Sequence, residues 1–206
     1  MLQHPRVRPP ASCILPLVVA LVALVTASPA SAGQFDLQFG GQVPFEPEER
    51  QQFDASPWFG AGLSGQMGQS QVHPFIEVGW LLVRQHSDDV FHVSDYPSAV
   101  TYDLVPVTIG LRLDLNRKPV VRSPTRLFLG AGFQTILVHA TAPDGTTEDA
   151  PTYGAILEIR PEYRAPGGVT LWISQRVNVM AAAAFDLVPD LELNGATLSG
   201  GLGFWW

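Results

Sequence analysis

The chain contains very little cysteine: Cys13 is the only one in 206 residues. A disulfide framework or a thiolate metal site needs several cysteines, so neither is possible within this chain. Lysine and arginine number 12 against 19 aspartate and glutamate residues, and this negative balance argues against nucleic acid as a partner. No phosphate-binding loop, nucleotide fingerprint or EF-hand motif is present. We therefore expect no cofactor, no metal site and no nucleic-acid partner.

Long apolar runs are also absent beyond residue 32, so the sequence predicts no transmembrane helix there. The first 32 residues read differently. Arg6 and Arg8 precede an apolar run at 14–26, and residues 30–32 read Ala-Ser-Ala. A positive segment, a short apolar core and a small-residue cleavage site predict a secretory signal peptide. We expect cleavage near Ala32, which leaves one domain at 33–206.

The remaining chain alternates between apolar and polar residues in long runs separated by glycine and proline. Alternation with period two predicts β-strands with one apolar face. The runs match or exceed the roughly 9–11 residues of a tilted transmembrane strand. Pro106 and Pro161 fall inside runs, and we expect local bulges there because proline donates no ladder hydrogen bond. The eight runs are 34–43, 58–67, 72–85, 102–115, 125–140, 152–164, 169–181 and 195–206.

The last run, GATLSGGLGFWW, ends the chain on an aromatic residue. A soluble protein rarely leaves two tryptophans on an uncovered edge strand, because such an edge aggregates. Its pattern resembles the C-terminal assembly signal of bacterial outer-membrane β-barrels, and the matching residues are Ser199, Gly201, Phe204 and Trp206. The chain as a whole resembles the small OmpA/OmpX/OmpW-type barrel domains. That resemblance implies recognition of the tail by the barrel-assembly machinery.

The connections between the expected strands differ in length and charge. Those after the first, third, fifth and seventh runs are longer and acidic, as the external loops of an outer-membrane barrel would be. Divalent cations could bridge these loops to lipopolysaccharide, and His86 and His92 lie near three of the acids. The acidic residues are Glu46, Glu48, Glu49, Asp54, Asp88, Asp89, Asp95, Asp144, Glu148, Asp149, Asp186, Asp190 and Glu192.

These observations together predict an all-β fold: an eight-stranded antiparallel up-and-down transmembrane β-barrel. A secreted β-sandwich or lipocalin-like barrel is the alternative, since alternation alone does not say which face meets water. Aromatic residues near the strand ends would form the girdles of a membrane barrel. They are Trp58, Trp80, Phe91, Tyr96, Tyr102, Tyr153, Tyr163, Phe185, Phe204 and Trp206.

An eight-stranded barrel is just wide enough for its inward side chains to fill it. The inward charges alternate in sign, which favours a plugged polar lumen over a narrow solute path. We expect a lumen charge network of Glu77, Arg112, Asp114, Arg126, Glu158, Arg160, Glu162, Arg164 and Arg176.

The function that this pattern favours is a structural or surface-interaction protein of the outer membrane. We expect a monomer whose partners are outer-membrane lipids, lipopolysaccharide and the assembly machinery. A channel for small or hydrophobic solutes is the alternative. An outer-membrane lipid hydrolase is a weaker one, because the nearest catalytic pattern is His139 followed by Thr141, and Glu148 or Asp149 would have to fold back to orient the histidine. We therefore expect no enzyme activity.

Overall fold

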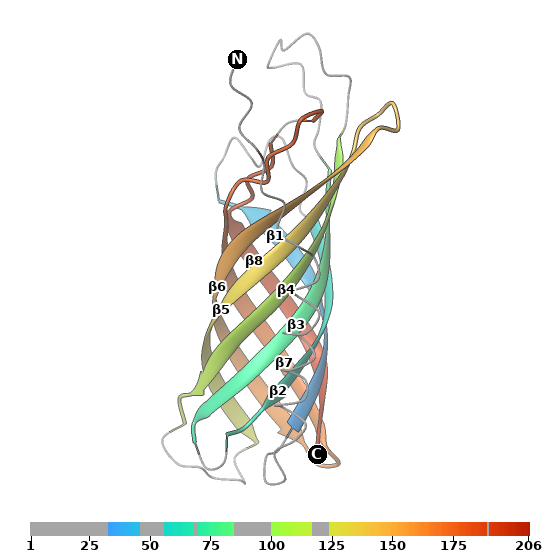
Figure 1. Cartoon of the computed structure of the whole chain (residues 1–206). Coiled ribbons are helices and arrows are strands. Elements are labelled where there is room, and N and C mark those ends of the chain that lie inside the picture. The colour runs from blue at the N-terminus through green and yellow to red at the C-terminus, as the bar shows by residue number, and fades with distance from the viewer. Residues whose placement is uncertain (1–32, 46–55, 68–69, 85–99, 117–123, 189) are drawn as a thin grey trace.

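The computed structural model describes residues 33–45, 56–67, 70–84, 100–116, 124–188 and 190–206. Each strand pairs antiparallel with its neighbours in chain order, and the first pairs with the last, which closes the sheet into a barrel (Figure 1). The predicted all-β, eight-stranded antiparallel barrel is confirmed. The described residues contain no helix long and apolar enough to cross a membrane. The strands are β1 (Gly33–Pro44), β2 (Ser56–Gly65), β3 (Val72–Arg84), β4 (Thr101–Asp114), β5 (Thr125–Thr141), β6 (Thr147–Ala165), β7 (Val169–Met180) and β8 (Gly195–Trp205).

The two faces of the barrel wall have opposite character. Along β7, Leu171 and Ile173 are 48% and 59% exposed, whereas Ser174 and Arg176 are 0% and 2% exposed. The same alternation runs along the other strands, so the outer face is apolar and the inner face largely polar. A soluble barrel or sandwich needs the reverse arrangement, with its apolar face inside. The alternative of a soluble β-sandwich is therefore wrong.

The ends of the barrel differ in what joins the strands. At the end drawn at the bottom of Figure 1, here called the lower end, β1 begins and β8 ends. The connections at this end run between residues 65–72, 114–125 and 165–169. The connections at the upper end run between 44–56, 84–101, 141–147 and 180–195. The predicted acidic residues at 46–54 and 88–95, the histidines 86 and 92, and the aromatic residues 91 and 96 lie outside the described residues.

One upper connection is shorter than the sequence suggested. β6 begins at Thr147, five residues before the predicted strand, and β5 continues to Thr141. The two are joined by a tight turn in which the Ala142 N–H donates to the Thr146 carbonyl, and Gly145 has φ of 85°. The expected long acidic loop is thus a regular hairpin, because residues 147–151 pair fully with 137–141 despite their polar sequence.

The two internal prolines do not create bulges. Pro106 pairs with Ile136 of β5, and Pro161 pairs with Leu127 of β5. On the other side of each proline the ladder is interrupted, but the register beyond the gap is unchanged. The missing N–H of each proline is therefore accommodated where the ladder is interrupted, toward β3 for Pro106 and toward β7 for Pro161. The prediction of bulges was wrong because losing one donor does not require an extra residue.

Candidate functional site

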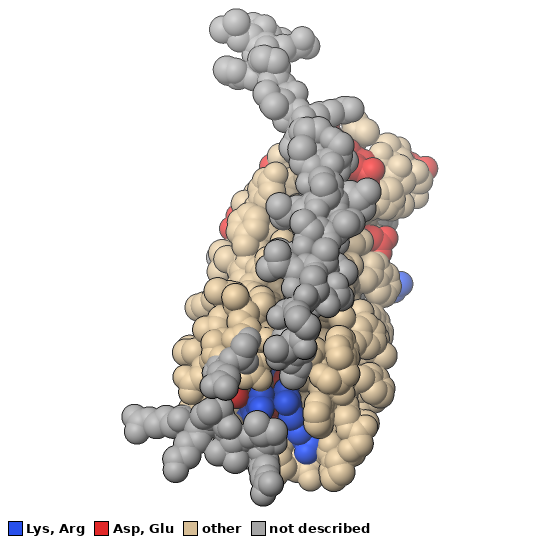
Figure 2. Space-filling view, turned by 60° about the horizontal axis from the view of Figure 1, so that its bottom comes forward, with Lys and Arg blue, Asp and Glu red and all other residues tan. Residues whose placement is uncertain are grey.

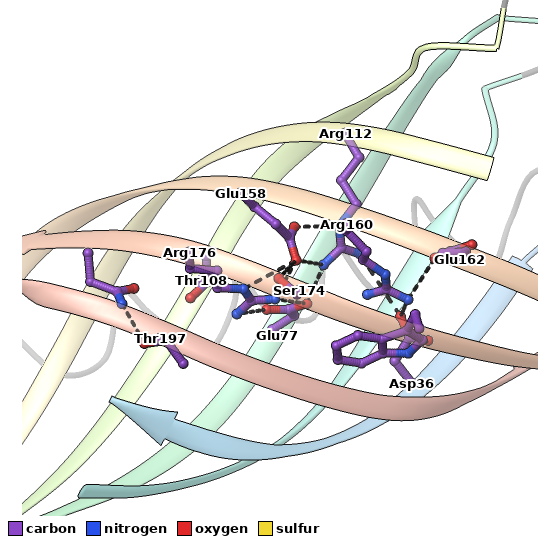
Figure 3. A network of polar contacts seen from close by, with 12 residues as sticks. Asp36, Glu77, Thr108, Arg112, Glu158, Arg160, Glu162, Ser174, Arg176 and Thr197 are labelled. Carbon is purple, nitrogen blue, oxygen red and sulfur yellow. Dashed lines mark hydrogen bonds and ion pairs between the residues drawn. The ribbon is translucent and has the colours of Figure 1, made fainter. Parts of the chain in front are cut away.

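The interior of the barrel holds a network of charged side chains from five strands (Figure 3). At its centre, Glu158 of β6 faces Arg112 of β4 and Arg176 of β7. The Arg112 Nε lies 2.8 Å from Glu158 Oε2, and the Arg176 Nη2 lies 3.0 Å from Glu158 Oε1. Glu77 of β3 completes the group, because both arginines also donate to its carboxylate. The Ser174 hydroxyl donates to Glu158 at 2.7 Å.

A second group adjoins the first toward the lower end. The Arg160 Nη2 lies 2.8 Å both from Asp36 Oδ2 and from Glu162 Oε1. The Asp36 carboxylate also accepts a hydrogen bond from the Trp172 indole at 3.1 Å. The guanidinium of Arg160 stacks over that indole, with 3.9 Å to the ring centroid. All these side chains are buried.

Burial of so many charges is tolerable only if every charge has partners. Moving an isolated ion from water into a low-dielectric interior costs several kcal/mol. A well-placed opposite charge together with additional hydrogen bonds offsets this cost. Here each carboxylate of the two groups contacts at least one guanidinium. Alternating arginine and glutamate along the inner face of β6 produces this arrangement, since residues two apart point to the same side.

The lower opening is lined by basic residues. Figure 2 shows arginine side chains gathered there. Arg126 approaches Asp114 at 3.6 Å, and Arg164 lies over the Trp205 ring at 5.4 Å from its centroid. A small cavity beside Arg164 and His73 opens at this end.

Above the charged network the interior side chains become neutral. The Gln134 amide donates to the Thr108 hydroxyl at 3.0 Å, and the Asn178 amide donates to the Thr197 hydroxyl at 2.6 Å. Thr197 in turn donates to Gln42. This layer of amides and hydroxyls separates the charged network from the upper part of the interior.

The upper part of the interior is apolar. Trp58, Tyr102, Leu104 and Val138 point inward from three strands, β2, β4 and β5, and are buried. The connection between β7 and β8, residues 181–194, packs onto them and is called the plug segment below. Its buried side chains are Ala183, Phe185, Val188, Leu191 and Leu193.

The plug segment has its own fixed structure. Ala183 and Leu191 exchange two backbone hydrogen bonds of 2.8 and 3.0 Å. The Phe185 ring lies 6.0 Å from that of Tyr102. From the side, the Glu148 carboxylate on β6 accepts the N–H groups of Asp186 and Leu187 at 2.8 and 2.9 Å. The connection therefore fills the upper opening with packed side chains.

The structure brings together most of the residues proposed for the lumen network. Glu77, Arg112, Glu158, Arg160, Glu162 and Arg176 form the two groups described above. Asp114 and Arg126 pair separately nearer the lower rim, and Arg164 has no carboxylate within ion-pair distance among the described residues. Asp36 was missed, although it alternates with the lipid-facing Phe35 and Leu37 and so could have been found.

The apolar upper interior was not predicted. Alternation identified an outer and an inner face, but it gave no reason to expect apolar residues on both faces near the upper end. The sequence pattern therefore predicts Trp58, Tyr102 and Phe185 in a lipid-facing girdle. They are buried inside the barrel, with 5%, 1% and 8% exposure, so that assignment was wrong. Trp80, Tyr153, Tyr163, Phe204 and Trp206 do lie exposed on the outer face.

The proposed assembly signal spans both faces of β8. Ser199 and Gly201 point inward, whereas Phe204 and Trp206 are exposed on the outer face. A methyl group on Gly201 would lie 2.1 Å from the Leu37 carbonyl oxygen and 2.5 Å from the Trp172 ring. Gly201 is therefore required by packing as well, whatever reads the tail.

The histidine considered for catalysis lies on the outer face near the upper end. The His139 Nδ1 is 2.6 Å from Asp149 Oδ1, because the two residues are directly opposite in the β5–β6 ladder. The idea that an acid would have to fold back onto His139 was therefore wrong. Among the described residues, no group of three or more histidine, cysteine, aspartate or glutamate side chains could hold a metal ion.

Comparison with solved structures now places the fold. The chain superimposes on the Neisserial surface protein A, NspA, with a TM-score of 0.58 and 12% identity, over 85% of this chain and 96% of that one. The chain has the fold of a small bacterial outer-membrane β-barrel. Ail, the attachment invasion locus protein of Yersinia pestis, gives a TM-score of 0.50 and 8% identity, over 85% of this chain and 98% of that one. No protein-family model and no curated protein matches the sequence. The likeness to these barrels is thus one of fold.

Proposed function

We propose that this protein is an integral protein of the bacterial outer membrane, with a structural or surface-interaction role and no open pore. The observation that carries the proposal is the filled interior: buried ion pairs below, amides and hydroxyls between, and the packed plug segment above. The apolar outer face supports membrane insertion, because lipid is the solvent in which such a face is stable. NspA and Ail, whose fold the chain shares, support the same location.

The N-terminal residues fit this location. Residues 1–32 would act as the signal peptide, with cleavage near Ala32, and 33–206 would form the barrel domain. Ser199, Gly201, Phe204 and Trp206 would be read by the barrel-assembly machinery during insertion. The upper end, with its acidic connections, would face the outside and contact lipopolysaccharide and surface partners. We expect no nucleic-acid partner.

The absence of conduction is directly testable. The full-length chain would be expressed, recovered from the outer membrane and incorporated into planar lipid bilayers. We expect no stepwise ion conductance, because buried ion pairs occupy the lower interior and the plug segment packs against the apolar side chains of the upper interior. A variant lacking most of the plug segment, with residues 183–191 replaced by a short glycine-serine linker, serves as comparison. Regular conductance steps from the unaltered protein would instead favour the solute channel.

An enzymatic role would need more than the His139–Asp149 pair. The structure supplies an oriented imidazole on the outer face. The hydroxyl two residues along the strand belongs to Thr141, which pairs with Thr101 and Thr147, so these neighbouring hydroxyls are all from threonine. Replacing His139 by asparagine should leave the phospholipid and lipopolysaccharide composition of the membrane unchanged. A change in acyl composition that follows this substitution would favour the hydrolase.

A further inference from the structure

The lipid-facing belt contains one amide in its middle. Gln175 points outward from β7 and is exposed, with Leu171 and Ile173 below it and Val177 and Val179 above it on the same face. Across the ladder it lies opposite Ile159 of β6 and Leu198 of β8, which are 52% and 64% exposed. The amide is therefore surrounded by apolar side chains at about half the height of the belt.

An amide at that depth lacks what it needs. Its two N–H donors and its carbonyl oxygen have no hydrogen-bond partner among the described residues, and acyl chains offer none. Polar groups in the hydrocarbon region are costly unless they are paired, and those that persist there usually face another protein surface. Lipid alone therefore does not account for Gln175.

The wall beside Gln175 is also unusually bare. Gly200 of β8 and Gly41 of β1 both point outward in this sector. A Cβ built on either would meet its nearest atom at 3.5 or 3.6 Å, an ordinary contact. By contrast, a Cβ on the inward Gly40 or Gly201 would come within 2.2 Å of a backbone oxygen. The chain's own packing thus explains the inward glycines but not the outward ones.

We propose that the β7–β8–β1 face, defined by Gln175, Gly200 and Gly41, is an interface with a second copy of this chain. Two copies inserted in the same direction are related by a two-fold axis along the membrane normal, so each residue meets its counterpart at equal depth. An amide is self-complementary: each Gln175 donates an N–H to the other's carbonyl oxygen and accepts one in return. The glycines let the two walls approach. This replaces the expectation of a monomer, and it rests on the proposed membrane location.

Cysteine crosslinking tests the interface in the intact membrane. Each variant of the full-length chain carries Cys13→Ser, so that the introduced cysteine is the sole one. Leu198→Cys, which lies opposite Gln175 on the outer face and leaves the amide in place, should form a disulfide-linked dimer under mild oxidation. Ile109→Cys is the matched control, because Ile109 faces outward in the middle of β4, four strands from β8 in either direction. We expect a severalfold higher dimer yield from position 198. Equal yields, or none at either position, would overturn the proposal.

Non-cysteine variants address the chemistry of the contact. The mass of the detergent-solubilised protein, corrected for bound detergent by light scattering, should be that of a dimer. Gln175→Leu and Gly200→Phe should each shift it to a monomer, while the gel mobility of the unheated, folded barrel stays unchanged. A dimer that survives both substitutions would refute this interface. Loss of the protein from the membrane fraction in the unaltered chain would instead refute the proposed function itself.

Discussion

Arg176 of β7 reaches across the interior to Glu77 of β3, with 2.7 Å between its Nη1 and Glu77 Oε2. The two strands lie four places apart in a closed ring of eight, on opposite walls of the barrel. Because Arg112 of β4 donates to the same carboxylate, the ion pairs link three strands through the interior. The barrel is therefore held together by contacts through its centre as well as by the hydrogen bonds around its wall.

Replacing Glu158 by glutamine should destabilise the barrel strongly. Its carboxylate accepts hydrogen bonds from Arg112, Arg176 and Ser174, and the substitution leaves two buried guanidinium groups short of a counter-charge. Breaking a buried pair in this way costs about 3–5 kcal/mol. The free energy of unfolding in urea, followed by tryptophan fluorescence in lipid vesicles, measures the loss. Glu192→Gln on the exposed upper surface is the control, and an equal effect there would contradict the central role of Glu158.

Truncating Leu191 to alanine should loosen the plug segment. Leu191 is fully buried, and a buried leucine replaced by alanine typically costs about 2–5 kcal/mol. The loss should appear locally, as faster hydrogen exchange at the Ala183 and Leu191 amides that bond to each other. Leu187→Ala is the matched control because Leu187 is 58% exposed. Unchanged exchange in the Leu191 variant would mean that the apolar contacts do not hold the segment in place.

The C-terminal residues should separate into a packing role and a recognition role. Gly201→Ala should impair the barrel both in cells and after refolding from urea into lipid vesicles, since its methyl group would collide with the Leu37 carbonyl. Trp206→Ala should reduce the amount assembled in cells while leaving vesicle refolding nearly normal. Parallel yields from the two systems provide the measurement. If Trp206→Ala fails equally in vesicles, the tail acts through stability and not through recognition.

The turn between β5 and β6 should respond to acid. The backbone N–H of Thr146 donates to the Asp144 carboxylate at 2.9 Å, and this bond lowers the pKa of Asp144 below its ordinary value. The ionised Asp144 carboxylate stabilises the turn fully above the ordinary aspartate pKa. This stabilisation is lost as the pH falls through the lowered pKa of Asp144. The Thr146 amide chemical shift, followed by NMR, should show this titration. In Asp144→Asn it should be absent, and a titration that persists would assign it to another group.

Side-chain alternation predicted the strands and their number, but the choice of a closed membrane barrel over a β-sandwich also needed the signal peptide, the strand lengths and the aromatic C-terminus. The alternation was informative because every strand of a membrane barrel has an apolar outer face and a more polar inner face. Leu171, Ile173 and Val177 show this pattern along β7. The alternation also predicted most of the charged network, since charges such as Glu158 and Arg160 can only be tolerated inside. It could not predict which charges pair across the interior, because that depends on the stagger between distant strands.

The plug segment escaped prediction for a related reason. Its apolar residues, including Phe185, Val188 and Leu191, follow no period of two or of 3.6, and their neighbours are acidic. They are buried because Tyr102 and Leu104, which are far from the plug segment in sequence, form part of an apolar surface at the upper opening. Only the closed barrel creates that surface. The hairpin at 141–147 was likewise hidden, because its polar strands extend past the apolar belt.

Heat-modifiability in an outer-membrane fraction tests the central claim most directly. The protein would be compared on a denaturing gel with and without boiling, after separation of membrane and soluble fractions. A closed, membrane-embedded barrel with a filled interior should remain in the membrane pellet and migrate differently before boiling, because it resists unfolding in detergent. A protein found in the soluble fraction, with the same mobility in both samples, would contradict the account.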